Sequence, residues 1–435
     1  VSQGSRWKSA RLGRSSTKVT HMADMVATLV ASCCAGSCDA WACAPALPSC
    51  TDEADRCSGN YTKVAMITGA NRGVGLGVAK VLFRRGWAVI LMCRDMRSAD
   101  AAAKKLRCCC GTGTVETCHF DLDDLASVRA AARKYHRRGL TQGVGFRVSA
   151  LVNNAAEVSP SCMATNYLGP FAFTLLMLDL LAPGAVVVNV SSCAHAGAPS
   201  SVAPSSPTMT VDVAAPAPKD AWSEYVRSKA ANLMFSLALS RRLAEATSTV
   251  RVVACHPGVL PTRLWKFGCS DTGVVDATAL LSLLRKLDVV GAPDLLPLHC
   301  ICCKGARTAG AGVAFLAAGG ATPACGCIPV LPAVRRAAVR SGGYYQQLCC
   351  VYSLPVRASE QMYDVAQQEA LWRWSMDALR AAPDAGDECV ADIDAVAQSI
   401  GVGEALPPAN ALPRVGWAGS EILTYVAASP VACFC

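Results

Sequence analysis

The stretch Val64-Ala65-Met66-Ile67-Thr68-Gly69-Ala70-Asn71-Arg72-Gly73-Val74-Gly75 decides the fold of this chain. Its first half is an apolar run, which predicts a strand over Val64–Thr68. Its second half is a glycine-rich turn, and a helix is predicted directly after it, over residues 75–85. A strand that passes through such a turn into a helix is typical of the first unit of a parallel α/β sheet.

Strand and helix patterns keep alternating after this first unit. Further strands are expected at residues 88–93, 115–120, 150–153, 185–190 and 250–255. Helices are expected between them, at residues 99–107, 125–138, 168–181 and 223–245. Strands that alternate with helices of this length predict a Rossmann-type, doubly wound α/β fold with helices on both faces of a parallel sheet.

A single domain over residues 61–380 is expected to contain this pattern. Residues 1–60 carry small residues without sustained periodicity and are expected to form a poorly ordered N-terminal extension. Residues 381–435 are mixed in character and punctuated by proline, so we expect a C-terminal tail, to which no chemistry is assigned. Segment 197–219 is rich in Pro, Ala and Ser and is expected to be a loop.

Composition and charge argue against two classes of partner. Lys and Arg number 41 against 32 Asp and Glu, and the net charge of +9 is spread thinly, without a basic stripe interleaved with aromatics. Nucleic acid is therefore not expected as a partner. One long charge-free stretch, residues 309–334, holds five glycines and three prolines. That composition breaks a lipid-exposed helix, so no transmembrane span is expected.

Cysteine usage bounds the redox chemistry of the chain. The 25 cysteines are scattered singly and in runs through a long sequence and are odd in number, which favours reduced thiols over a disulfide framework. Cys34 with Cys38, and Cys300 with Cys302 and Cys303, approach metal-ligand spacing. Neither group has a matching second pair with histidines, so no metal site is expected.

The first twenty residues leave the compartment open. They contain five Lys and Arg residues among serines, and no acid precedes Asp24. This pattern resembles an organellar transit segment, while an arbitrary upstream extension with a start at Met22 or Met25 fits equally well. A cytoplasmic and an organellar location both stay open.

The glycine-rich turn has the composition of a phosphate-binding loop. Glycines let the backbone approach a pyrophosphate, which the N-terminus of the following helix then holds. A glycine-rich connection without any ligand would look similar, so the surrounding motifs must decide. The residues of this turn expected to bind a cofactor are Gly69, Asn71, Arg72, Gly73, Val74 and Gly75.

Arg94 stands at the end of the second expected strand, where a site that prefers NAD offers a carboxylate to the ribose 2′-hydroxyl. A guanidinium suits a 2′-phosphate instead, and Arg72 could add a second positive charge. This favours NADP(H), with NAD(H) as the less favoured cofactor. Asp95 is expected to face elsewhere, and the alternative for each arginine is a solvated surface charge.

Tyr225 and Lys229 stand four residues apart on the last long helix. On a helix this spacing puts the phenol and the ammonium on one face. The positive charge can there lower the pKa of a phenol that otherwise titrates near ~10. The pair is read as a proton donor for a carbonyl, and the alternative is an amphipathic helix that carries an incidental pair.

The order of motifs resembles the short-chain dehydrogenase/reductase family, in the branch of retinol dehydrogenase-like and protochlorophyllide reductase-like enzymes. The resemblance covers about residues 61–380. The matching pieces, in chain order, are the glycine turn, Cys93-Arg94-Asp95, Asp121-Leu122, Asn153-Asn154-Ala155, Asn166-Tyr167-Leu168-Gly169, Val188-Asn189-Val190-Ser191-Ser192, the Tyr225 and Lys229 pair, and His256-Pro257-Gly258 with Thr262.

The resemblance implies a catalytic set of Asn166, Ser192, Tyr225 and Lys229. Tyr225 would be the general acid, Ser192 would hydrogen-bond the carbonyl oxygen, and Lys229 would hold the nicotinamide ribose and lower the pKa of the phenol. Asn166 would anchor a water that resupplies Lys229 with protons. The cofactor residues implied in addition are Asp121 and Leu122 at the adenine, Asn153 and Ala155 on the adenosine side, and Pro257, Gly258 and Thr262 at the nicotinamide.

Two features of the pattern leave alternatives open. The chain between Asn154 and Asn166 is shorter than usual for the family, so either the helix begins late and still delivers Asn166, or the site is distorted. His256 is expected to be a loop residue that supports Pro257 rather than a catalytic base. Asn189 begins a glycosylation sequon, but it is expected at a buried strand end and is discounted.

The function expected from these residues is NADP(H)-dependent interconversion of a carbonyl and an alcohol on a small apolar substrate, such as retinal, a steroid, an aldehyde or a ketone. Leu264, Trp265 and Phe267 would line a substrate lid, or are ordinary core residues. Two alternatives remain: a protochlorophyllide reductase-like enzyme, and a non-catalytic NADP-binding module of the same fold. A homo-oligomer is compatible with the sequence.

Overall fold

A computed structural model describes residues 62–109, 111–142, 146–198, 200–202, 221–258, 306–320, 339–347, 353–356 and 358–381. The expectations for residues 1–60, most of segment 197–219, Thr262, the lid residues, the candidate metal-ligating cysteines and almost all of the C-terminal tail lie outside these described residues.

An eight-stranded sheet forms the centre of the molecule, in the order β3-β2-β1-β4-β5-β6-β7-β8. Neighbouring strands from β3 through β7 are parallel, and only β8 pairs antiparallel. The chain reverses its direction of travel across the sheet between β1 and β4, the place where open α/β sheets bind ligands. The strands are β1 (Val64–Thr68), β2 (Ala88–Cys93), β3 (Thr114–His119), β4 (Val148–Asn153), β5 (Leu181–Val190), β6 (Arg251–His256), β7 (Tyr344–Gln347) and β8 (Ser353–Val356).

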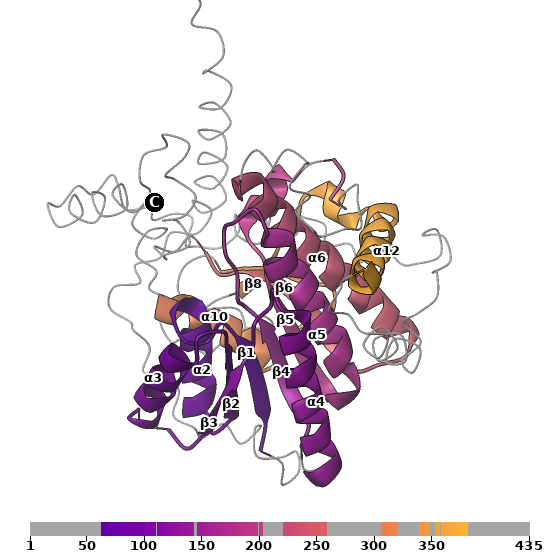
Figure 1. Ribbon diagram of the computed structural model, residues 1–435. Coiled ribbons are helices and arrows are strands. Elements are labelled where there is room, and N and C mark those ends of the chain that lie inside the picture. The colour runs from indigo at the N-terminus through magenta and orange to yellow at the C-terminus, as the bar shows by residue number, and fades with distance from the viewer. Residues whose placement is uncertain are drawn as a thin grey trace, which may run out of the picture.

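Helices cover both faces of this sheet, which confirms the predicted doubly wound α/β fold (Figure 1). One face carries α2 (Gly73–Arg84), α3 (Met96–Arg107) and α10 (Ala306–Ala317). The other carries α4 (Leu125–Gln142), α5 (Gly169–Met177) and α6 (Ala221–Glu245), and α12 (Val365–Ala381) packs against α6.

Alternate residues of each strand belong to the two different cores. In β1, Val64 and Met66 join the cluster under α4, α5 and α6, while Ala65 and Ile67 join the cluster under α2, α3 and α10. Because side chains alternate across a strand, a strand buried on both faces must be apolar at every position. This is why β1 and β2 read as uninterrupted apolar runs and why their bounds match the prediction.

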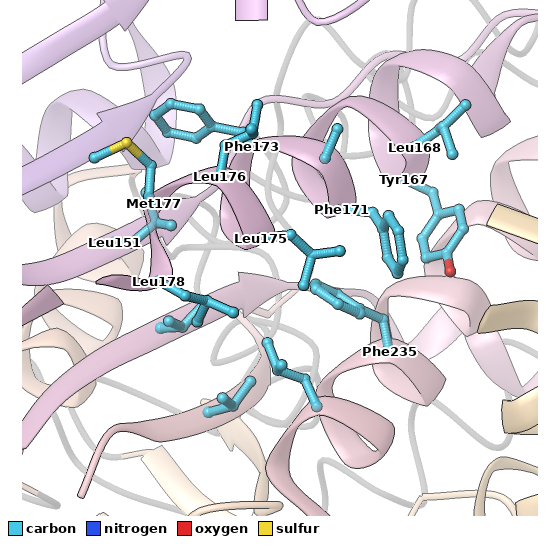
Figure 2. Packing of buried hydrophobic residues seen from close by; sticks show 14 of the residues in the cluster. Leu151, Tyr167, Leu168, Phe171, Phe173, Leu175, Leu176, Met177, Leu178 and Phe235 are labelled. Carbon is cyan, nitrogen blue, oxygen red and sulfur yellow. The ribbon is translucent and has the colours of Figure 1, made fainter. Parts of the chain in front are cut away.

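The core on the α5 side is built around aromatic rings. Every residue of α5 is buried. Figure 2 shows Phe171 of α5 beside Phe235 of α6, with ring centroids 5.0 Å apart, and Tyr167 next to them. Trp372 of α12 meets Phe171 edge-on, also at 5.0 Å. These contacts hold α5, α6 and α12 in one packed unit, with α6 between the sheet and the C-terminal helix.

On the opposite face, α2 and α10 touch through their backbones. A Cβ atom added to Gly310 would lie only 2.5 Å from the Cα of Gly77. Glycine at position 310 therefore allows a separation that no larger residue permits there. The contact places α10 directly against the helix that follows the glycine turn.

The structure corrects the bounds of the region around α5. We predicted one helix over residues 168–181, but helical structure starts earlier, in a π-helical turn η3 (Ala164–Leu168), and ends in a 3₁₀ turn η4 (Leu178–Leu180). The strand that follows begins at Leu181, four residues before the predicted position 185. In addition, α10, β7, β8 and α12 were not predicted as elements.

No helix within the described parts of the chain is both long and apolar enough to span a membrane. Within the same parts, no group of three or more His, Cys, Asp and Glu side chains is arranged to hold a metal ion.

Candidate active site

The glycine turn after β1 is clamped by the end of β4. The hydroxyl oxygen of Thr68 accepts hydrogen bonds from the backbone amides of Asn154, at 2.9 Å, and Ala155, at 3.0 Å. In return, Nδ2 of Asn154 donates to the carbonyl of Thr68 at 2.9 Å. Gly69 has a φ of +64° and faces Ala155, and a Cβ on Gly75 would lie 2.6 Å from Nδ2 of Asn154. The turn therefore requires glycine at both positions.

The N-terminus of α2 has the features of an anion site. Arg72 occupies the N-cap position without a side-chain capping hydrogen bond, and the first turn carries no acid. Gly73 has a φ of +58°, and a Cβ there would meet no atom of the described residues within 4 Å. A helix N-terminus offers backbone N–H groups and a positive dipole end to an anion. These residues fit the pyrophosphate of a dinucleotide cofactor.

The end of β2 carries an exposed guanidinium among carboxylates. Arg94 lies 3.7 Å from Asp123 and 3.9 Å from Asp121, and its side chain is 61% exposed. Asp95 faces away, as expected, because its carboxylate caps α3 by accepting from the amides of Arg97 and Ser98. Hydrogen bonds from Ser98 lower the pKa of Asp95. The carboxylate of Asp95 therefore caps α3 and is not available to bind a ribose.

The residues expected near the adenosine are placed in different environments. Leu122 is buried, and Ala155 lies beside Gly69. Asn153 does not present its side chain to a ligand: its Nδ2 donates to Thr174 at 2.9 Å and to Asn189 at 2.8 Å, inside the core. The side chain of this last residue of β4 points to the face covered by α5 and α6, so only its backbone could face an adenosine, and the placement of Asn153 on the adenosine side stays a prediction.

The other expected cofactor residues lie in the turn or next to strand ends. Nδ2 of Asn71 donates to the hydroxyl of Ser98 at 2.7 Å, and Val74 is half-buried in the first turn of α2. Pro257 and Gly258 follow β6 and are half-buried, with a φ of +92° at Gly258. His256 is the last residue of β6 and is buried, so the expectation of a loop residue is wrong.

Tyr225 and Lys229 lie on one face of α6, as the four-residue spacing predicts. The Nζ atom of Lys229 lies 5.5 Å from the centroid of the Tyr225 ring and donates a hydrogen bond to the carbonyl of Val190 at 3.0 Å. The hydroxyl of Ser191 donates to the carbonyl of Lys229 at 2.7 Å. The end of β5 thus fixes both the backbone and the amine of Lys229.

Burial dominates the protonation of this pair. It raises the pKa of the Tyr225 phenol above its ordinary value, and a hydrogen bond with Ser192 opposes that rise in part. Burial also lowers the pKa of Lys229 to about 8. The expected lowering of the phenol pKa by Lys229 is not found in the chain alone, because burial sets the direction of the shift and Lys229 is not among its causes. At neutral pH the phenol is protonated, as a proton donor must be.

Ser192 lies where β5 gives way to the 3₁₀ turn η5 (Cys193–Gly197). Its Oγ accepts from the amide of Ala194 at 3.2 Å, which caps that turn, and the same side chain bonds the phenol of Tyr225. Ser192 and Tyr225 therefore come together from two elements, as the motif order implied.

Asn166 is delivered by the π-helical turn η3, so the helix begins late and still presents this residue. It is buried, its Oδ1 accepts from the amide of Glu157 at 2.8 Å, and its Nδ2 donates to the carbonyl of Glu157 at 2.9 Å. The same Nδ2 donates to Ser228 at 3.0 Å, and the Ser228 hydroxyl donates to the carbonyl of Tyr225 at 2.7 Å. Asn166 is thus one side chain away from the backbone of Tyr225.

An apolar cluster surrounds the phenol-bearing residue. Tyr225 packs with Val158, Cys162 and Ala194, and the ring of Trp222 stacks on it at 5.3 Å with 27° between the planes. Sequence reasoning did not assign roles to Thr68, Asn154, Glu157 or Ser228. Thr68, Asn154 and Ser228 lie inside motifs that were quoted for other residues, whereas nothing local to Glu157 marks it.

Comparisons with known proteins show what this chain is similar to. The family profile described as short chain dehydrogenase matches residues 63–204. Retinol dehydrogenase 13 of Mus musculus is 36% identical over 214 residues, which cover 46% of this chain and 60% of that protein. Retinol dehydrogenase 11 of Homo sapiens is 32% identical over 209 residues, 46% of this chain and 62% of that protein.

The chain spans about 60% of the length of the retinol dehydrogenases that it matches. It covers 68% of the short-chain dehydrogenase TIC 32 B, chloroplastic, of Brassica napus, to which it is 30% identical over 233 residues, 49% of this chain. The family inferred from the order of the motifs is confirmed: this chain belongs to the short-chain dehydrogenase family.

Proposed function

We propose that this protein is an oxidoreductase that interconverts a carbonyl and an alcohol on an apolar substrate with NADP(H). The observation that carries the proposal is the Tyr225 phenol, which is buried, protonated and hydrogen-bonded to Ser192. Lys229 lies on the same helix face, 5.5 Å from the phenol ring. A proton donor and a second hydrogen-bonding hydroxyl at one point suit an oxygen that gains negative charge.

The cofactor would be held by the glycine turn and the N-terminus of α2. When bound, its nicotinamide would supply hydride to the carbonyl carbon or accept hydride from it. The Tyr225 hydroxyl would then give its proton to the carbonyl oxygen, and Ser192 would orient that oxygen by a hydrogen bond. Lys229 would return a proton to the phenol, for which its pKa of about 8 is suited.

Asn166 would act through the backbone that it holds. Its side chain bonds both the N–H and the C=O group of Glu157, and it also bonds Ser228. It thereby fixes the segment after β4 against the helix turn that carries Tyr225. Its proposed role as the anchor of a proton-supplying water rests on the family resemblance.

The preference for NADP(H) over NAD(H) is supported by the end of β2. Arg94 leaves most of its side chain exposed there, and Asp95 is committed to capping α3. Arg94 would bind a 2′-phosphate by exchanging its loose contacts with Asp121 and Asp123 for charge-assisted hydrogen bonds.

The apolar nature of the substrate is supported by the cluster around Tyr225. Val158, Cys162, Ala194 and Trp222 offer no charge next to the phenol. The names of two similar proteins refer to retinol, an apolar alcohol. We therefore propose retinal-like, steroid-like and other apolar aldehydes or ketones as the substrate class.

The proposal is tested by measuring turnover of retinal, steroids, quinones and short aldehydes with NADPH and NADH, in the full chain and in a Tyr225→Phe variant. Loss of the phenol hydroxyl should lower kcat by about two to four orders of magnitude while NADPH still binds. The control is Tyr135→Phe on α4, which removes a buried hydroxyl bonded to Glu116 of β3 and should leave kcat unchanged. Equal turnover by Tyr225→Phe and the parent chain would overturn the mechanism.

The same assay decides between the proposal and its alternatives. Tight NADPH binding without turnover of any member of the panel would identify a non-catalytic NADP-binding module. Light-dependent turnover of protochlorophyllide would identify a protochlorophyllide reductase-like enzyme.

A further inference from the structure

His195 lies in η5, three residues after Ser192, and is buried with a relative exposure of 5%. Its Nδ1 atom lies 2.7 Å from the carbonyl oxygen of Ser192. Its Nε2 atom lies 3.4 Å from the backbone amide nitrogen of Ser359. Neither contact belongs to the proton-transfer chemistry proposed above, and both involve a side chain to which the sequence analysis assigned no role.

The two partners define the tautomer of the ring. A carbonyl oxygen only accepts, so Nδ1 must carry the proton, and a backbone N–H only donates, so Nε2 must be bare. The ring is therefore neutral. Burial lowers the pKa of His195, which also favours the neutral form. Because both nitrogens of this neutral imidazole form hydrogen bonds, the orientation of the ring is fixed.

The Ser192 carbonyl receives two donors from this one residue. The backbone amide of His195 donates to it at 3.2 Å, and the ring donates at 2.7 Å. Together these two hydrogen bonds fix the peptide group that follows Ser192. The backbone of Ser192 has a φ of −152° and a ψ of 156°, and this conformation sets the direction of the Ser192 side chain. The side chain of Ser192 in turn lies close enough to the Tyr225 phenol to lower its pKa.

We propose that His195 is a positioning residue that holds Ser192 in reach of the substrate oxygen, and that it does so through the Nδ1 hydrogen bond to the Ser192 carbonyl. This inference rests on the proposed function, because Ser192 matters only if a carbonyl or alcohol oxygen binds between it and Tyr225. His195 does not touch the reacting atoms.

The other side of the ring connects the serine turn to the C-terminal part of the domain. Ser359 precedes the 3₁₀ turn η7 (Glu360–Tyr363), in which Met362 is fully buried, and the ring of Tyr344 in β7 meets His195 edge-on at 5.1 Å. The ring therefore has a support on β7 and a weaker, longer bond to the segment before α12. We assign the contacts with Tyr344 and Ser359 to holding the ring in place, and the hydrogen bond to the Ser192 carbonyl to the positioning of Ser192.

Three substitutions separate these contacts. The amide of His195→Asn can donate to the Ser192 carbonyl in place of Nδ1, but it is too short to reach Ser359. The amide of His195→Gln reaches the position of Nε2 and can accept from Ser359 instead. His195→Phe keeps a ring against Tyr344 and loses both hydrogen bonds.

For each variant, kcat and KM would be measured for NADPH and for the best aldehyde or ketone of the panel, together with the thermal midpoint. His195→Asn should retain kcat within about threefold, while His195→Gln and His195→Phe should lose about 10- to 100-fold, because a small displacement of a catalytic group is costly. The KM for NADPH should not change, since the glycine turn is untouched. Equal losses in His195→Asn and His195→Gln, or losses that follow the thermal midpoint alone, would reduce His195 to a structural role.

A second measurement separates this inference from the proposed function. Amide hydrogen exchange over residues 193–198 should stay slow in His195→Asn and become faster in His195→Phe, whether or not the chain turns over any substrate. A parent chain without turnover would refute the proposed function alone. Unchanged exchange in His195→Phe would refute the positioning of Ser192 by His195, even in an active enzyme.

Discussion

At the residue scale, the buried ammonium of Lys229 lowers the stability of the fold and is available to the proposed proton transfer. Its folded-state pKa of about 8 lies below the ordinary value of 10.5, so the folded chain releases this proton more readily than the unfolded chain. Below pH 8 both states are protonated, and burial of the ammonium costs about 3 kcal/mol. The cost disappears between pH 8 and 10.5, so this group makes the fold more stable as pH rises through that window.

Lys229→Met should therefore stabilise the folded chain while it abolishes turnover. After subtraction of the lost hydrogen bond to Val190, the gain at pH 7 should be roughly 1–3 kcal/mol and should shrink towards pH 10. Thermal unfolding across this pH range measures it. Lys134→Met is the control, since Lys134 is about half exposed and paired with Glu116, and should give no gain. A destabilised Lys229→Met chain, or a pH-independent difference, would contradict the account.

Arg94 carries the prediction on cofactor choice. Arg94→Asp replaces the guanidinium with a carboxylate that repels a 2′-phosphate, so the ratio of kcat/KM for NADPH to that for NADH should fall at least about tenfold. Arg133→Asp, an equal change of charge on the exposed side of α4, should leave the ratio unaltered. A ratio that does not respond to Arg94→Asp would remove this residue from the cofactor site.

At this scale, sequence alone brought Tyr225, Lys229 and Ser192 together, because four-residue spacing and motif order are readable in the chain. The contacts between Asn154 and Thr68, 86 positions apart, and between Ser359 and His195, 164 apart, leave no local trace. The burial of a residue likewise leaves no local trace in the sequence. The direction of the pKa shift at Tyr225 depends on residues that pack around it, which no spacing reveals.

The element scale shows why some predicted bounds held and others did not. β1 and β2 are apolar at nearly every position, with the glycine turn after β1 and Gly86 shortly before β2, so these strands were readable. α10 consists largely of alanine and glycine and has no apolar stripe to distinguish it from a loop. The four residues of β7 include two glutamines, which obscured the strand. The turn η3 before α5 was missed because a π-helical turn breaks the ordinary helical period.

The contact between α2 and α10 makes a prediction at this scale. Gly310→Ala would push a methyl group into the backbone of α2 at Gly77 and should destabilise the fold by about 1–3 kcal/mol. Because α2 also forms the proposed phosphate site, the KM for NADPH should rise. Denaturant unfolding and cofactor titration measure the two effects. Gly320→Ala, whose Cβ would approach only the Phe315 carbonyl at 4.0 Å, is the control and should be close to neutral.

At the scale of the whole molecule, α12 is tied to the proposed catalytic helix α6 by a carboxylate that pairs with two arginines, in addition to its apolar packing. Glu369 of α12 pairs with Arg241 at 2.9 Å and also with Arg242, and both arginines lie on α6. Arg242 is buried, its guanidinium lies 4.3 Å from the centroid of the Trp372 ring, and burial lowers its pKa. A charge buried at this junction depends on its partner.

Glu369→Gln should therefore destabilise the entire domain by about 2–4 kcal/mol, because it leaves the Arg242 charge poorly compensated inside the fold. The loss should appear as one cooperative shift in thermal unfolding. Asp377→Asn is the matched control on the same helix, where the partner Arg380 is exposed and the pair should contribute less than about 1 kcal/mol. Equal shifts in the two variants would show that α12 is held by its apolar face alone.

Asn166 has one more consequence for the molecule. Its amide offers Glu157 one acceptor and one donor, the same pairing that an adjacent strand would offer. The segment after β4 is thus fastened at two points, at Asn154 by Thr68 and at Glu157 by Asn166. Between such fixed points a chain can shorten without displacing what it connects. We therefore predict that the brevity of the segment between Asn154 and Asn166 does not impair the proposed site.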